Sequence, residues 1–218
     1  MRPLAGTWRA DAGQDSSPKA DGPQRKPFTE TITMAPIDPQ TNGPQVFYGL
    51  RYHIHITTPN EAAIFHDQVG YWLWEPATGL SLQTLAILRG QSLLAAGRAS
   101  ADARSFSVEA RRGAATYGIT TNEFLDQAFR TERYRIAITC HDDASWSYQA
   151  ETDLIVRGPP RRNRSTALQP RDEWVQPQPR PLNPASRHPW PVTTAARPRS
   201  RRRQGFSDAR GRRGGSAR

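Results

Sequence analysis

The chain has 218 residues, a net charge of +10 and a sequence pI near 10.7. The basicity is uneven: residues 159–218 hold 15 arginines, no lysine and three acidic residues, so they carry +12 and residues 1–158 carry −2. A near-neutral first part excludes a basic nucleic-acid-binding face there, and the length allows one domain with a tail.

Cys140 is the one cysteine of the chain, which excludes an intramolecular disulfide and a cysteine-rich zinc site. It predicts a buried thiol in a strand. No apolar run approaches the ~20 residues of a membrane-spanning helix, and the N-terminus has no apolar signal-peptide core. We therefore expect a cytoplasmic protein with no membrane partner.

Alternation of apolar and polar residues predicts strands through most of residues 1–158. In chain order, the expected strands cover residues 4–9, 28–37, 46–57, 61–74, 80–88, 92–100, 105–110, 131–140 and 145–156. Residues 10–27 are rich in glycine, serine and proline and predict a loop. Residues 120–129 fit either a short helix, with Thr120 and Glu123 as a capping box, or a strand that runs into a loop.

His53 and His55 lie two residues apart, so a strand places both side chains on one face. That spacing can present two imidazoles to a metal ion. Arg51 and Thr57 share the face, which favours a polar outer wall instead.

Residues 65–76 are the most informative stretch, because they hold four aromatic residues and one histidine in an otherwise polar chain. Alternation places on one face His66, Gln68, Gly70, Trp72 and Trp74. Both faces are bulky, which suits either a barrel wall that lines a ligand cavity or a sandwich strand with exposed aromatics. An imidazole at His66 can ligate iron or donate to a ligand, or it can be a hydrogen-bonded structural histidine.

About nine or ten strands with short turns and no long helix predict an antiparallel all-β fold. We expect an up-and-down barrel of about ten strands, calycin-like, because closure removes exposed edges. Two packed sheets are the alternative.

The composition changes after Gly158. Residues 159–218 contain 10 of the 19 prolines and few aliphatic residues, so we expect a barrel domain over residues 1–158 and a disordered Arg/Pro-rich tail over 159–218. The arginines of residues 199–203 can bind nucleic-acid phosphates weakly and without sequence preference. A solvated tail with no dedicated partner is the favoured interpretation.

The sequence contains no glycine-rich phosphate loop, no His-Glu-x-x-His and no Gly-x-Ser-x-Gly. His66 and Asp67 are adjacent, so they point to opposite faces and cannot pair. His141, Asp142 and Asp143 fall in a predicted turn, where such groups are usually solvated. Catalytic residues therefore stay unassigned.

Several segments in order resemble the nitrobindin-like haem-binding β-barrels, once called fatty-acid-binding-protein-like proteins. The resemblance covers about residues 3–158. It is carried by Leu4-Ala5-Gly6-Thr7-Trp8, Asp21-Gly22, Leu50-Arg51-Tyr52-His53, Phe65-His66-Asp67-Gln68-x-Gly70-Tyr71-Trp72, Arg89-Gly90, Leu94-Ala95-Ala96-Gly97 and Trp146-Ser147-Tyr148.

The resemblance implies a ten-stranded barrel whose interior binds haem b with ferric iron. It implies nitrogen oxides as reactants and peroxynitrite isomerisation to nitrate as the candidate enzyme activity. It places an axial histidine on the final strand, soon after the position of Gly158, and a histidine at the position of His66 on the distal side. A homodimer is compatible with it.

Two departures from the family pattern matter. Ala10 stands where the entry motif has glycine, and a segment with Pro159, Pro160 and several arginines stands where the final strand should carry the axial histidine. The downstream histidine is His188. We therefore expect a missing last strand and impaired haem binding, and hypothesise a change of reading frame near codon 158.

The preferred function is a haem-binding, nitrobindin-like barrel whose cavity is lined by Trp8, His66, Trp72 and Tyr148, with His66 as the candidate near the iron. The first alternative is a carrier of a small apolar ligand without redox activity. A third is a nucleic-acid-associated protein that acts through its arginine tail.

Overall fold

The computed structural model describes residues 2–19, 22–60, 63–156 and 160–169. Within them the chain forms eleven strands, a 3-10 turn at Arg2–Leu4 and one helix, α1 (Glu123–Ala128). The strands are β1 (Gly6–Lys19), β2 (Gly22–Asn42), β3 (Gln45–Thr57), β4 (Ile64–Trp74), β5 (Leu80–Ile87), β6 (Gln91–Arg98), β7 (Ser105–Arg112), β8 (Gly118–Thr121), β9 (Arg130–Cys140), β10 (Trp146–Ile155) and β11 (Pro160–Gln169). No helix in these residues is long and apolar enough to cross a membrane.

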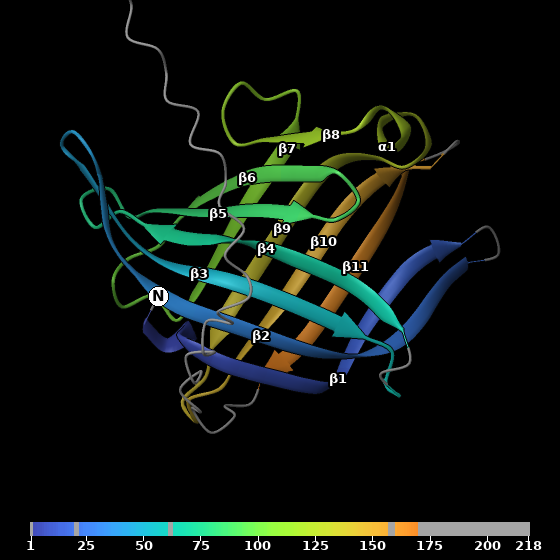
Figure 1. Cartoon of the computed structure of the whole chain (residues 1–218), viewed down its shortest axis with the longest axis horizontal. Coiled ribbons are helices and arrows are strands. Elements are labelled where there is room, and N and C mark those ends of the chain that lie inside the picture. Colours follow the sequence, from blue (N-terminus) through green and yellow to red (C-terminus); the bar gives the residue numbers. More distant parts are fainter. Residues whose placement is uncertain (1, 20–21, 61–62, 157–159, 170–218) are drawn as a thin grey trace, which may run out of the picture. The chain divides into compact units, whose positions relative to one another are not determined.

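The strands wrap into one closed barrel (Figure 1). Their order is β1-β11-β10-β9-β7-β8-β6-β5-β4-β3-β2, and β2 pairs back with β1. The described pairs are antiparallel except for a short parallel contact between β7 and β8. The prediction of an antiparallel all-β barrel is confirmed, and the alternative of two packed sheets is wrong.

The hairpin of β1 and β2 replaces the loop predicted over residues 10–27. Residues 13–19 pair with residues 22–28, so cross-strand pairing overrides the turn propensity of this segment. The pairing shifts register between Ala10 and Gly13, which marks a bulge in β1. A Cβ atom at Gly13 would lie 2.1 Å from the ring of Phe28, so glycine lets that ring pack against the bulge.

The expectation that the last strand is missing is wrong. Residues 160–169 form β11, which pairs along its whole length with β10 and over three residues with β1. The barrel therefore extends beyond the boundary predicted at Gly158. The expected disorder of the rest of the tail concerns residues 170–218, which lie outside the described residues, as does His188.

Strand β11 forms despite its polar sequence because its two faces are both satisfied. Arg162 and Arg164 lie outside and pair with Asp153 and Glu151 of β10 at 2.7 and 2.5 Å. The alternate positions face the interior: Asn163 and Ser165 line the central cavity, and Ala167 is buried. The arginines that suggested a tail are thus the outer face of a barrel strand.

Arg133 of β9 joins this outer ladder of ion pairs. Its guanidinium lies 2.7 Å from Asp153, 3.2 Å from Glu109 and 3.6 Å from Glu151. Burial raises the pKa of Asp153, but hydrogen bonds from Arg162 and Arg133 outweigh it, so the net pKa lies below the ordinary value. The hydrogen bond from Arg164 is the largest cause that lowers the pKa of Glu151.

This ladder predicts acid-sensitive stability. A carboxyl group with a lowered folded-state pKa stabilises the fold above its unfolded pKa of about 4, and this contribution is lost as the pH falls through the folded pKa. We expect Asp153→Asn to lower the free energy of unfolding by about 1 kcal/mol at pH 7. In urea titrations the difference from wild type should shrink toward zero below about pH 4. An equal difference at pH 3 would show that the ladder does not act through charge.

The segment predicted as a helix or a strand end contains both. Residues 118–121 form β8, and α1 follows. The predicted capping residue is wrong: Asn122 caps the helix, because its side chain accepts a hydrogen bond from the backbone N–H of Leu125 at 2.9 Å.

Candidate ligand cavity

The barrel encloses a cavity of about 400 Å³, a size typical of small-molecule sites. Its wall mixes aliphatic and aromatic side chains with a few polar groups that converge from several strands. The polar and aromatic lining residues include Asp15, Glu30, His66, Gln68, Trp72, Gln83, Tyr134, Trp146, Tyr148, Asn163 and Ser165. Of the two alternatives for the strand over residues 65–76, a barrel wall that lines a cavity is the one that β4 forms.

His66 is the one histidine among the described residues that line this cavity. Burial is the main cause that lowers its pKa below the ordinary value, although its contact with Gln68 opposes the shift. The imidazole is therefore mostly neutral at pH 7, the form that can ligate a metal or accept a hydrogen bond. As expected from alternation, Asp67 points to the outer face.

A chain of hydrogen bonds fixes the orientation of His66. Gln68 donates from Nε2 to the Tyr52 hydroxyl at 2.9 Å, so its Oε1 faces Nε2 of His66 at 3.1 Å. The neutral tautomer that satisfies this contact has the proton on Nε2 and the lone pair on Nδ1. Tyr52 in turn donates to the carbonyl of Thr84 at 2.8 Å. The wall thus holds one imidazole with a defined acceptor atom.

The network continues to the opposite wall. Gln83 donates to the Tyr52 hydroxyl at 3.3 Å, and Tyr134 donates to Oε1 of Gln83 at 3.1 Å. Burial raises the pKa of both Tyr52 and Tyr134. Both phenols stay protonated at neutral pH, so they act as fixed donors in the wall.

Two buried carboxyl groups also line the cavity, those of Glu30 and Asp15. Tyr148 donates to Glu30 Oε1 at 2.9 Å, and Glu30 is only 1% exposed. Asp15 is also buried and accepts hydrogen bonds from Ser17 and Ser165 at 2.6 and 2.7 Å. Burial and the nearby Glu30 raise the pKa of Tyr148 well above its ordinary value. Because iron binds a tyrosine as phenolate, His66 is the better candidate metal ligand of the two.

Strand β11 supplies polar groups but no imidazole. Its described cavity-lining side chains are Asn163 and Ser165. The side-chain oxygen Oδ1 of Asn163 is buried and has no hydrogen-bond partner among the described residues. The indole N–H of Trp146 is in the same condition. Buried polar atoms normally have a hydrogen-bond partner. A ligand with polar groups could supply the partners for these two atoms of the cavity wall.

Three of the four predicted cavity residues line the cavity: His66, Trp72 and Tyr148. The prediction for Trp8 is wrong. Its indole is 1% exposed, donates to the carbonyl of Leu4 at 2.8 Å, and meets Trp146 edge to face with ring centroids 5.9 Å apart. Trp8 is therefore a core residue behind Trp146 and does not contact the cavity.

Sequence reasoning missed the buried carboxylates and most of the polar network. Glu30 shares a strand face with Phe28, Ile32 and Met34. An acidic residue on an otherwise apolar face indicates a polar group inside the barrel, so the sequence alone could have predicted it. Asp15 gave no such signal, because its segment read as a loop. Tyr52 and Gln83 lie on strands whose pairing with β4 brings them to Gln68, and alternation alone does not give pairing.

These features define a closed β-barrel with a mixed polar and aromatic interior for a small ligand. The family model of the THAP4-like, heme-binding beta-barrel domain matches residues 1–169, and the chain belongs to this family. The match includes β11, in agreement with the corrected end of the barrel. The predicted resemblance to nitrobindin-like barrels is confirmed.

The crystal structure of Rv2717c from M. tuberculosis has a similar fold. The two chains share 16% sequence identity with a TM-score of 0.55, and the alignment covers 78% of this chain and 94% of that one. At this identity the likeness shows the fold alone. No curated protein matches the sequence significantly.

The described residues fit haem in three respects: a cavity within the general size range of ligand sites, an aromatic wall with Trp72, and the neutral imidazole of His66. They differ in one respect from what the resemblance implies: the final strand, β11, carries no histidine that could be the axial iron ligand. The described cavity-lining imidazole lies instead on β4.

Proposed function

We propose that the barrel interior binds haem b and that His66 is the protein ligand of its iron. The observation that carries this proposal is the single described imidazole in the cavity, kept neutral by burial and oriented by Gln68, in a chain of the heme-binding barrel family. When bound, haem b supplies ferric iron for chemistry with nitrogen oxides, and peroxynitrite isomerisation is the activity we propose for the loaded protein.

The protein contributes binding and orientation. Apolar and aromatic side chains cover part of the cavity wall, and Trp72 makes an edge-to-face contact with Phe106, with ring centroids 5.7 Å apart. The protonated phenol of Tyr148 is a fixed hydrogen-bond donor inside the cavity, now directed to Glu30. The absence of a histidine from β11 removes one anchor, so we propose weaker haem binding than a barrel with that histidine achieves.

An absorbance titration with ferric haemin tests the proposal. Wild type should bind one equivalent with a shifted Soret band. Asn163→His should increase the affinity at least about tenfold, because it places an imidazole on the cavity-facing side of β11 where the unpartnered Oδ1 now lies. No Soret shift in either protein would overturn the proposal.

The second candidate function is transport of a small apolar ligand without redox activity. It is favoured by the aliphatic part of the cavity wall, which includes Ile32, Leu85 and Ile136. A fluorescent fatty acid separates the two candidates. Under the haem proposal haemin displaces the probe stoichiometrically, whereas probe binding without any haemin binding would favour the carrier.

The remaining expectations stay predictions: a cytoplasmic location, a homodimer and weak, non-specific nucleic-acid binding through the tail. Two of the arginines counted for the tail, Arg162 and Arg164, are engaged in ion pairs on the barrel. Any nucleic-acid contact by the tail would therefore depend on the arginines after residue 169.

A further inference from the structure

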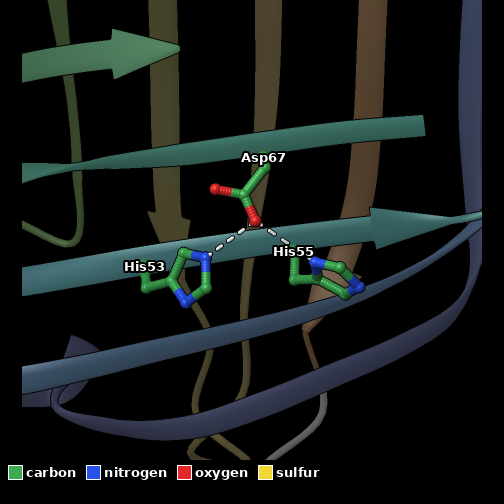
Figure 2. Close-up of side chains that lie close together, drawn as sticks. All are labelled: His53, His55 and Asp67. Carbon is green, nitrogen blue, oxygen red and sulfur yellow. Dashed lines mark hydrogen bonds and ion pairs between the residues drawn. The ribbon is translucent and has the colours of Figure 1, made fainter. Parts of the chain in front are cut away.

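Two histidines and an aspartate meet on the outer wall of the barrel (Figure 2). His53 and His55 lie on β3, and Asp67 lies on β4, directly opposite His55 in the strand register. Asp67 points outward because its neighbours His66 and Gln68 both line the cavity. The cluster is therefore separated from the ligand cavity by the barrel wall.

The three side chains converge on one point. Oδ2 of Asp67 lies 3.0 Å from Nε2 of His53 and 3.3 Å from Nδ1 of His55, and the three ligand atoms all lie within 4.8 Å of one another. A tetrahedral zinc ion with bonds of about 2.0–2.1 Å keeps its ligand atoms about 3.3 Å apart. Both nitrogen-to-oxygen distances are thus within a few tenths of an ångström of those of a zinc site.

The types of ligand atom indicate which kind of ion the site would bind. Two imidazole nitrogens and one carboxylate oxygen suit a divalent transition metal, whereas calcium and magnesium prefer oxygen ligands alone. Three protein ligands leave a fourth position for water, the pattern of zinc sites that remain open.

Charge and access also favour a cation. The carboxylate of Asp67 contacts both imidazoles, so it offers an anionic ligand atom where they converge. The side chains of His53 and His55 are 52% and 39% exposed, which leaves a path for an ion from solvent. Two hydrogen-bonded strands of a closed barrel hold the three residues, so little backbone ordering accompanies binding.

We propose that His53, His55 and Asp67 form a binding site for a divalent transition-metal ion of the zinc class on the outer face of β3 and β4. In this site the ion takes the place of the hydrogen bonds between Asp67 and the two imidazoles. The ion would clamp β3 to β4 beside His66. This site does not rest on the proposed haem function, because it uses the other face of the wall and none of the cavity residues.

Calorimetric titration of the metal-stripped, tag-free full chain with Zn²⁺, without haem, tests the proposal. Wild type should bind one equivalent. His55→Ala and Asp67→Asn should each weaken binding at least about tenfold, since even residues that only orient a ligand contribute that much. His141→Ala is the matched control and should bind like wild type, because His141 is an exposed histidine that contacts Ser147 at 2.9 Å, on the separate β9–β10 hairpin.

A second readout guards against variants that fold poorly. Co²⁺ bound by wild type should give visible absorption bands of a four-coordinate site, and these should be lost in Asp67→Asn while its circular dichroism and melting temperature without metal stay close to those of wild type. No binding by wild type would overturn the proposal. So would equal binding by wild type, His55→Ala and Asp67→Asn, which would show that the ion lies elsewhere on the chain.

Discussion

A chain that ends at residue 159 is expected to lose the barrel fold, whereas a chain that ends at residue 169 is expected to keep it. The difference between them is β11, which fills the gap between β10 and β1. Without it the barrel has two open edges, the cavity is exposed to solvent, and Asp15 loses its bond from Ser165. These losses together are comparable to the whole stability of a domain, about 5–15 kcal/mol.

Circular dichroism melting and size-exclusion chromatography of the two truncated chains provide the measurement. The chain ending at residue 169 should be monodisperse, with a cooperative melt close to that of the full chain. The chain ending at residue 159 should aggregate or melt without cooperativity. Equal melting temperatures would show that β11 is not a part of the barrel.

Replacement of His66 by alanine is expected to lower haemin affinity about 100-fold, because it removes the proposed iron ligand. The fold should survive, since the loss of the contact with Gln68 costs only about 1 kcal/mol. The titration follows the Soret band, and the urea midpoint of the variant without haem reports its stability.

His141→Ala is again the control, because it removes an exposed imidazole that does not line the cavity. It should leave the Soret titration unchanged. If His66→Ala binds haemin as tightly as wild type does, then His66 is not the iron ligand. The candidate residues for haem contact would then be Tyr148 and Glu30.

The fold was predictable where strands alternate clearly. The strand expected over residues 46–57 agrees with β3 to within one residue, and the expected closure into a barrel is confirmed. The prediction failed where strand pairing forms in a segment whose amino-acid composition is typical of a loop. Residues 10–27 read as a loop from their prolines and glycines, yet β1 and β2 pair there.

Strand β11 shows the same limit more strongly. Its arginines resemble a charged tail until Glu151 and Asp153 of the neighbouring strand are known to face them. The hypothesis of a reading-frame change near codon 158 stays a prediction. Translation of the coding DNA in the other two frames tests it: a strand with a His-Thr-Asp-like segment would support it, and its absence from both frames would refute it.

The candidate site was predictable in part. Periodicity and the aromatic stretch placed His66 and Trp72 on the cavity face, and the resemblance added Tyr148. Trp8 was misplaced because an aromatic residue in a family motif fits a core as well as a cavity. For the outer cluster the sequence gave His53 and His55 but not Asp67, because the register between β3 and β4 is not visible in either strand alone.

The central claim is that the ligand binds inside the barrel, and a cavity-filling substitution tests it most directly. Ala150 lines the cavity, whereas its neighbour Gln149 is exposed. In haemin titrations Ala150→Phe should bind at least about tenfold more weakly than wild type, because the added ring occupies the ligand's space, and Gln149→Phe should bind like wild type. Unchanged binding by a folded Ala150→Phe variant would contradict the claim and place the haem site outside the cavity.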